Sequence, residues 1–423
     1  MKKLVSIVLA LMLVLSMAAV ASAETTGSVY YLNFKPEADQ AWQDLAALYT
    51  EKTGVQVKVL TAASGQYDTT LTTEMDKGDN APTLFQCGNQ GAVNTWGSYC
   101  MDLTGTKLFN ELTTEDFNMK GENGETLSIG YCYESFGIIV NTALLEKAGY
   151  KLSDITNFAS LKAVAEDIHA RASELGFDAF TSSGMDGSSS WRFSGHLANM
   201  PLFYEFRDDG VTEQPATITG KYLDNFKAIW DLYIQNSAAD PAQLSSYTGD
   251  QAEAEFGEGK AVFYQNGTWE YSNLTGTFGM KDEDLAMIPI YCGVEGEEDA
   301  GLCSGTENCW AINKNAPQEN IDATLDFLYW VVTSDEGTTM LAEQFGPCPF
   351  KNAKESANVF CNNANAYTAE GKYVVTWAFN YTPAVDDWRA GVVSAMTQYS
   401  AGGSWDDVVT AFVNGWAYQY ENQ

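Results

Sequence analysis

Histidine and arginine are scarce in this chain of 423 residues. His169 and His196 are the only histidines, and the eight cysteines form no CxxC motif, so the usual ligands of a zinc site are missing and no metal or cofactor is expected. Arginine occurs only at Arg171, Arg192, Arg207 and Arg389. Because the planar guanidinium is the usual clamp for carboxylates and phosphates, this scarcity disfavours a strongly anionic ligand.

Several catalytic signatures are also missing. The chain has no GxSxG, HExxH, Walker or GxGxxG motif, which leaves serine-hydrolase, zinc-protease and nucleotide chemistry without support. The paired acids Asp386-Asp387 and Asp406-Asp407 superficially fit a glycoside hydrolase, but neighbouring residues on a helix point in different directions. No catalytic residue is therefore assigned. A secreted glycoside hydrolase remains the alternative function. The absence of repeats argues against an adhesin.

The N-terminus has the order of a secretory signal. Lys2 and Lys3 precede an apolar run from Leu4 to Val20, and Ala21-Ser22-Ala23 follows. We therefore expect residues 1–23 to be a signal peptide, with an uncut membrane anchor as the alternative. The protein is expected to be exported, to a periplasm, the cell surface or the medium. Its formal net charge of −33 makes nucleic acid an unsuitable partner.

Cysteine usage leaves two interpretations open. Cysteines in an exported chain are able to form disulfides, and the pairs Cys303–Cys309 and Cys348–Cys361 would each close a short loop. In an anaerobic habitat, all eight cysteines would instead be buried free thiols.

The chain alternates between strand-like and helical segments. Residues 29–34 and 55–59 read as strands on either side of a helix that starts near Pro36 and ends at Gly54, and 82–85 is a further buried strand. This alternation is typical of an α/β fold with a parallel sheet. The rhythm breaks at 130–141, which indicates a change of domain. About 400 residues also exceed what one core usually organises.

Several segments resemble the bacterial ABC-transporter solute-binding proteins of extracellular family 1, the group that includes maltose-binding protein. They are YLNFKPEADQAWQDLAALYTEKTGVQVKV, APTLFQ, FGIIVNTALLEKAGY, FGEGKAVFYQNGTWEYSNL, LAMIPI and SWDDVVTAFVNGW, in this order over nearly the whole chain. The resemblance implies a class II periplasmic-binding-protein fold with two discontinuous lobes joined by a hinge. It also implies a monomer that captures a carbohydrate, expected to be an oligosaccharide, and delivers it to a membrane-embedded ABC permease. A non-sugar solute such as an amino acid, polyamine or peptide is the alternative ligand.

On this resemblance we expect the first lobe to comprise 24–132 and 267–345, and the second lobe 133–266 and 346–423. The chain would cross between the lobes near Cys132, Asn266 and Gly346, with Glu134 locking the hinge. Many Gram-positive relatives carry a lipid-modified cysteine at the end of the signal. Val20 stands in that place here, so lipid anchoring is not supported.

Aromatic side chains are the main candidates for ligand contact. In the stretch GKAVFYQNGTWEYSNL we expect a strand ending at Gln265, a turn at Asn266-Gly267, and a helix capped by Thr268 whose first turn holds Trp269 and Glu270. The resemblance suggests that Trp269 stacks on a sugar ring. Trp191 is the candidate for the opposing wall, and Trp377 and Trp388 compete for a third aromatic position.

Polar residues after strands complete the expected site. Ligands bind open α/β sheets at the carboxyl ends of parallel strands, where neutral amides suit sugar hydroxyls. The candidates in the first lobe are Asn33, Phe34, Gln66, Tyr67, Gln86 and Asn89.

Overall fold

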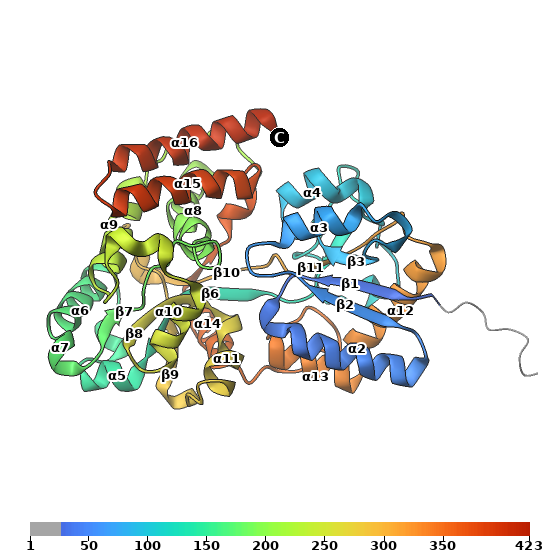
Figure 1. The fold of residues 1–423 in the computed structure, drawn as a ribbon, viewed down its shortest axis with the longest axis horizontal. Coiled ribbons are helices and arrows are strands. Elements are labelled where there is room, and N and C mark those ends of the chain that lie inside the picture. The colour runs from blue at the N-terminus through green and yellow to red at the C-terminus, as the bar shows by residue number, and fades with distance from the viewer. Residues whose placement is uncertain (1–26) are drawn as a thin grey trace, which may run out of the picture.

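The structure is a computed structural model that describes residues 27–423, and it consists of two α/β lobes, each built on one six-stranded sheet (Figure 1). The predicted two-lobed α/β architecture is confirmed. The predicted signal peptide, 1–23, lies outside the described residues. Between residues 27 and 423, no helix has the length and apolar character needed to cross a bilayer.

The first sheet has the strand order β2-β1-β3-β11-β5-β4. Its strands are β1 (Val29–Asn33), β2 (Val57–Thr61), β3 (Leu84–Gln86), β4 (Met119–Lys120), β5 (Thr126–Gly130) and β11 (Cys309–Ile312). β1 pairs in parallel with β2 and β3, as predicted, whereas β11 runs antiparallel to β3 and β5.

Helices cover both faces of this sheet. They are α2 (Asp39–Thr53), α3 (Tyr67–Met75), α4 (Gln90–Trp96), α12 (Gln318–Thr333) and α13 (Asp335–Gln344). Figure 1 shows α3 and α4 on one face and α2 with α13 on the other. All of β1 is buried, because Val29 and Tyr31 pack under α2 while Leu32 packs under α3. Gly54 ends α2 at φ +79°, a conformation that glycine adopts without strain.

The second sheet has the order β12-β10-β6-β8-β7, and β9 also pairs with β6. Its strands are β6 (Glu134–Asn141), β7 (Asp178–Phe180), β8 (Ala261–Gly267), β9 (Leu285–Ile288), β10 (Ala300–Gly305) and β12 (Tyr373–Thr376). β6 is central and entirely buried, since Ile138 packs into one core and Ile139 into the core on the other face. This explains its continuous run of apolar residues.

The second lobe holds most of the helices. They are α5 (Thr142–Lys147), α6 (Phe158–Ala170), α7 (Ala172–Leu175), α8 (Ala198–Asp209), α9 (Leu223–Gln235), α10 (Gly249–Gly257), α11 (Tyr271–Gly276), α14 (Val359–Ala369), α15 (Val385–Ser400) and α16 (Trp405–Asn422). A π-helix, Arg192–Leu197, leads into α8. α15 and α16 pack against each other as a hairpin at the C-terminal end (Figure 1).

The chain passes between the two sheets three times: from β5 to β6, from β10 to β11, and between α13 and α14. Cys132 and Gly346 lie in the first and third of these crossings. The predicted crossing at Asn266 is wrong, because Asn266 is a residue of β8 paired with Gly137 of β6. The second crossing instead occupies 306–308.

The predicted lobe boundaries change accordingly. Residues 267–305 were expected in the first lobe, but β9 and β10 both pair with β6 in the second sheet. The segment joins the first lobe only at β11.

The crossings are hydrogen-bonded to one another. The backbone N–H of Tyr131 donates to the carbonyl of Asn308 at 2.9 Å, which joins the first and second crossings. The N–H of Tyr133 donates to the carbonyl of Pro347 at 3.1 Å, which joins the first and third. The lobes are therefore connected by three adjacent segments that are joined by backbone hydrogen bonds.

All eight cysteines are free thiols in the structure. The predicted Cys303–Cys309 disulfide is wrong, because the two side chains point into different lobes. The Cys303 thiol contacts the Met200 sulfur at 3.6 Å in the second lobe, whereas the Cys309 thiol donates to the carbonyl of Phe117 at 3.6 Å in the first. The predicted Cys348–Cys361 bond is also not formed.

Candidate functional site

Trp269 follows the buried strand β8 and lies where the second lobe meets the first. β8 continues through Gly267, so the predicted turn at Asn266-Gly267 is wrong. A 3-10 helix, Thr268–Glu270, then leads into α11. The predicted cap by Thr268 is wrong, because its side chain does not cap this helix. Its hydroxyl instead accepts the backbone N–H of Ser135 at 3.3 Å, which ties the segment to β6.

Asn266 fixes the two side chains that follow it. Its Oδ1 accepts the indole N–H of Trp269 at 2.9 Å, and its Nδ2 donates to Glu270 Oε1 at 2.7 Å. Asn266 is 2 % exposed, so these bonds are shielded from water. It therefore acts as a positioning residue for the predicted site rather than as a hinge residue.

One face of the Trp269 indole lies against the backbone of Gly267. A Cβ atom added at Gly267 would lie only 2.1 Å from a ring carbon, far closer than such atoms approach. The absence of a side chain at position 267 is therefore what allows the ring to lie flat there. Only the opposite face of the indole remains for other contacts.

Gly267→Ala is expected to displace the Trp269 ring and to lower the free energy of unfolding by about 1–2 kcal/mol, the usual cost of overpacking. Gly276→Ala is the matched control, because a Cβ there meets nothing within 4 Å. Urea denaturation and the tryptophan emission maximum measure the two effects. Equal stability and emission for Gly267→Ala and the wild type would contradict this packing.

Trp191 and His196 surround Trp269 within the second lobe. The ring centroids of Trp191 and Trp269 are 6.1 Å apart, and those of His196 and Trp269 are 5.4 Å apart. The structure thus brings Trp191 and Trp269 together, but as neighbours in one lobe rather than as opposing walls. The indole N–H of Trp191 donates to the carbonyl of Ser188 at 2.8 Å, which fixes that ring as well.

His196 is neutral in this cluster. Its ring stacks on Phe136 with centroids 3.9 Å apart, and its Nδ1 lies 3.0 Å from Gln265 Nε2. Burial lowers the pKa of His196 well below its usual range, and the positive charges of Arg389 and Arg192 lower it further. His196 therefore offers an aromatic edge and hydrogen-bonding nitrogens without a charge.

Arg192 stabilises the second lobe. It is 1 % exposed, and its guanidinium donates to the carbonyls of Gln265 and Ser182, both at 3.3 Å, and to Ser189 Oγ at 2.6 Å. These bonds anchor the π-helix beneath the Trp191 loop. With its donors directed at its own lobe, Arg192 is not an anion clamp.

Lys35 reaches Trp269 from the first lobe. It follows β1, and its ammonium lies 4.8 Å from the centroid of the Trp269 ring. The same ammonium donates to the Glu134 carboxylate at 2.8 and 3.0 Å and lies 3.5 Å from Glu37. Burial alone would lower the pKa of Lys35, but Glu134 and Glu37 outweigh it and raise the pKa above its usual range. Lys35 is therefore a buried cation shared by both lobes.

Glu134 binds Lys35 at the first residue of β6, next to the first crossing. Its Oε2 also accepts the side-chain N–H of Asn308, in the second crossing, at 2.6 Å. The carboxylate is 3 % exposed and thus depends on these donors for stabilisation. Glu134 therefore connects the second lobe to Lys35 of the first lobe and to Asn308 of the second crossing.

Carboxyl groups gather beside this ion pair. Burial raises the pKa of Glu270 well above its usual range, and the nearby Glu253 and Glu37 raise it further. Burial likewise raises the pKa of Glu37 and of Glu253. Glu37 comes from the first lobe and the other two from the second, so the lobes face each other here across three acids.

Because of this arrangement, the contribution of Glu270 to the free energy of unfolding decreases as pH rises, which is the opposite of the usual behaviour of a carboxylate. Because its folded-state pKa is raised, Glu270 favours the folded state at low pH, and this contribution is lost as pH rises above about 4.5. Glu270→Gln does not titrate, so this variant should be more stable than the wild type at pH 8 and equal to it at pH 4. Thermal unfolding across this range tests the sign, with the exposed Glu283→Gln as control. A stability loss in Glu270→Gln at pH 8 would contradict it.

A second set of contacts joins the lobes away from the hinge. Burial and the neighbouring Asp386 of α15 raise the pKa of Asp68 in α3 to about 8. A Cβ atom at Gly65 would lie 2.5 Å from the carbonyl oxygen of Gly187, so the loop before α3 touches the loop before Trp191. The lobes therefore meet at these loops as well as at the Lys35–Glu134 ion pair.

The polar candidates of the first lobe mostly have structural roles. Asn33 is fully buried, and its amide bonds to the backbone of Lys35 and to Thr61, so its prediction as a ligand residue is wrong. The Tyr67 hydroxyl accepts the N–H of Gln86 at 2.7 Å and joins α3 to β3. Asn89 caps α4 by accepting the N–H of Ala92, and it donates to Glu307 at 2.9 Å.

Three further candidates keep accessible side chains near the lobe boundary. Phe34 is half-buried and packs edge to face with Tyr67 at 5.6 Å, while Lys35 lies 5.5 Å from its centroid. Gln66 is exposed at the start of α3, and the side chain of Gln86 is half-buried. These three stay predictions.

The C-terminal tryptophans lie in the core. Trp388 is 1 % exposed, donates to the carbonyl of Phe412 at 2.9 Å and packs between α15 and α16, so its prediction as a cleft aromatic is wrong. Trp377 is 8 % exposed, donates to the carbonyl of Cys303 at 3.1 Å and covers Gly305. It packs against the end of β10, next to the second crossing.

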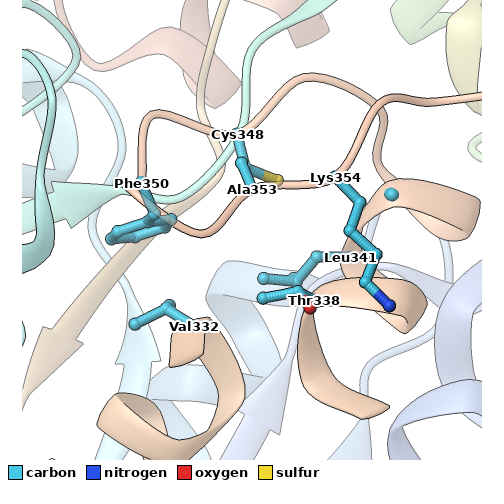
Figure 2. Close-up of a pocket in the computed structure, with 8 residues that line it drawn as sticks. Val332, Thr338, Leu341, Cys348, Phe350, Ala353 and Lys354 are labelled. Carbon is cyan, nitrogen blue, oxygen red and sulfur yellow. The ribbon is translucent and has the colours of Figure 1, made fainter. Parts of the chain in front are cut away.

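The two described pockets both belong to the first lobe and not to the boundary. Figure 2 shows one of them, beneath the third crossing, where Cys348 and Phe350 lie over Leu341 and Val332. The other, near Gly97 and Lys314, has a volume of about 470 Å³. Neither includes a predicted ligand residue.

Sequence reasoning missed Lys35, Glu37, His196, Gln265 and the positioning role of Asn266. Lys35 and Glu37 carried no motif and lie just after the first strand. His196 is one of two histidines and belongs to no motif. The dipeptide Asn-Gly predicted a turn. In the structure, the Asn266 side chain and the absence of a side chain at Gly267 position the Trp269 ring instead.

Solved structures of similar fold include RafE in complex with raffinose, at 15% identity and TM-score 0.73, covering 94% of this chain and 100% of that one. Another is the GacH receptor of Streptomyces glaucescens, determined unliganded and with acarbose, at 17% identity and TM-score 0.70, covering 94% and 99%. A third is the sugar transporter BL01359 from Bacillus licheniformis in complex with stachyose, at 16% and 0.69, covering 93% and 99%.

The comparison with curated protein sequences found no match. The family described as bacterial extracellular solute-binding protein matches residues 44–366, which is most of the chain and includes most strands of both sheets and the Trp269 segment. The chain therefore belongs to the bacterial extracellular solute-binding proteins.

Proposed function

We propose that this solute-binding protein captures a carbohydrate, most simply an oligosaccharide, between its lobes at Trp269 and delivers it to an ABC permease. The observation that carries the proposal is the Trp269 indole, which has one face fixed on Gly267 and whose ring centroid lies 4.8 Å from the Lys35 ammonium of the opposite lobe. A rigid ring with one available face suits the apolar face of a sugar. The ligands named in the structures of similar fold, raffinose, acarbose and stachyose, support the same class.

The surrounding polar groups suit hydroxyls. Carboxyl groups of Glu270 and Glu37 accept hydroxyl hydrogens, and the ammonium of Lys35 donates to ring or hydroxyl oxygens. His196 and Trp191 extend the aromatic surface beside Trp269. Because a sugar hydroxyl both donates and accepts, it matches this mixture better than an anionic group would.

Lobe closure would accompany binding. Lys35 and Glu37 are on one lobe and Trp269 and Glu270 on the other, so a ligand that bridges them favours the closed arrangement. A protein of this kind works as a monomer, and its closed form is the one that a permease recognises. We infer from the family that the protein is exported, and that the permease is a separate chain.

The test is thermal unfolding of the purified protein against mono- and oligosaccharides, amino acids, polyamines and peptides. A ligand that binds the native state raises the melting temperature by mass action, and chromatography of the mixture should find the sugar unchanged. Consumption of the sugar would instead indicate a glycoside hydrolase. Stabilisation by amino acids, polyamines or peptides, and by no sugar, would overturn the carbohydrate assignment.

A further inference from the structure

Two thiols flank one glycine in the third crossing between the lobes. The Cys348 thiol donates to the carbonyl of Gly346 at 3.4 Å, and a Cβ atom on Gly346 would lie 2.7 Å from the Cys361 sulfur. Both sulfur atoms therefore contact the same residue. Gly346 has φ +82°, which turns the chain sharply between them.

Cys348 is the accessible member of this pair. Among the eight cysteines, all within residues 27–423, it alone is not fully buried. Its side chain lines the pocket of Figure 2, together with Leu341 and Lys354. Cys361 is 4 % exposed and lies behind it.

The two cysteines are attached to different lobes. Cys348 belongs to a segment held on the first lobe, because the N–H of Thr113 donates to the carbonyl of Pro349 and the N–H of Lys351 to that of Glu111, both at 2.9 Å. Cys361 is in α14, whose neighbour Phe360 packs into a core of the second lobe. A bond between them would bridge the hinge.

We propose that Cys348 and Cys361 form a reversible disulfide when the exported protein meets oxidising conditions, and that this bond restrains movement of the third crossing. The disulfide would fix the segment between α13 and α14 to the first turn of α14. Lobe opening and closing must bend this segment, since it is one of only three connections in the described chain. The inference is independent of which solute binds.

A low-molecular-weight disulfide, such as oxidised glutathione, supplies the oxidant. The Cys348 thiolate attacks one of its sulfurs, and the first glutathione thiol leaves as the mixed disulfide forms. The Cys361 thiolate then attacks Cys348 Sγ and expels the second glutathione thiol. Two protein thiols lose two electrons and two protons in total, and the reagent gains both.

Burial controls the rate of this exchange. It raises the pKa of Cys361 to about 12 and raises the pKa of Cys348 as well. Because the thiolate is the nucleophile, formation should be slow at neutral pH and faster as pH rises. The bond would thus report sustained oxidation rather than a brief exposure.

The test is incubation of the purified protein with oxidised glutathione at pH 8.5, followed by thiol counting in denaturant. We expect the count to fall from eight to six and to recover with dithiothreitol. Trypsin cleaves after Lys351 and Lys354, between the two cysteines, so mass spectrometry should find the linked peptides. Hydrogen exchange across 346–358 should slow in the oxidised protein.

Cys361→Ser should abolish the linked peptides and the slower exchange, whereas Cys303→Ser, buried in the second-lobe core, should keep both. A count that stays at eight, a link to Cys132 instead of Cys361, or unchanged exchange across 346–358 would each overturn the proposal. Circular dichroism of the reduced variants establishes that both are folded.

Discussion

Replacing Glu134 by alanine should lower the free energy of unfolding by about 3–5 kcal/mol, the usual cost of leaving one member of a buried ion pair alone. Lys35 is 8 % exposed at its side chain and Glu134 is 3 % exposed, so the ammonium would keep only Glu37, at 3.5 Å, as an acidic partner and would have little access to water. The same change removes the acceptor of the Asn308 side chain. Urea denaturation at pH 7 measures the difference directly.

The surface pair Lys52–Glu336 provides the matched control. Its side chains are 42 % and 40 % exposed, so Glu336→Ala should cost less than about 1 kcal/mol. The double variant Lys35→Met with Glu134→Leu removes both charges and should recover most of the loss. If Glu134→Ala and Glu336→Ala lowered the free energy of unfolding equally, the hinge ion pair would contribute no more to stability than a surface pair.

Local pattern predicted the order of elements well. The alternation in residues 55–59, the proline near the start of α2 and the glycine at its end all have local physical causes, and each appears in the structure. Strand β8 was also located from its apolar pattern. Such features depend on neighbouring residues, so a single sequence contains the information.

Assignment of strands to lobes could not be made in this way. β9 and β10 have the same apolar character as the strands of the first sheet, and only their pairing with β6 places them in the second. That pairing joins residues more than 140 positions apart, such as Ile138 and Ile288. The boundary that the family resemblance placed near Asn266 therefore missed the true crossing.

The candidate site was predictable in part for the same reason. Trp269 and Glu270 belong to a compact motif, and the structure places both at the lobe boundary with Trp191. Lys35 and Glu134 are 99 residues apart and have no common motif, so only the fold brings them together. Trp388 was misassigned because a tryptophan on an amphipathic helix looks the same whether it faces a core or a ligand.

Lys35 links the hinge to the site. Its ammonium is bound by Glu134 beside the crossings and lies 4.8 Å from the centroid of the Trp269 ring. A ligand at Trp269 must therefore share or displace this cation, and any change in the ion pair alters the surface that the ligand meets. If the proposed site is correct, stability and binding are coupled through a single side chain.

Trp269→Ala should weaken sugar binding by about 1–3 kcal/mol, roughly tenfold to a hundredfold in Kd, because a fixed, half-buried aromatic ring is a typical binding hot spot. Asn266 and Gly267 hold the indole in place before any ligand arrives, so little ordering cost is paid on binding. Isothermal titration with the best sugar from the stabilisation panel measures the change.

Trp330→Ala is the matched control for this variant. Trp330 is also half-buried and packs against Tyr49, with centroids 5.1 Å apart, but it lies on α12 in the first lobe. Both variants should lose stability through the lost ring, and only Trp269→Ala should lose affinity. If Trp269→Ala bound the sugar as tightly as the wild type while melting at a lower temperature, the ring would be a packing element between the lobes, and the ligand would have to lie elsewhere.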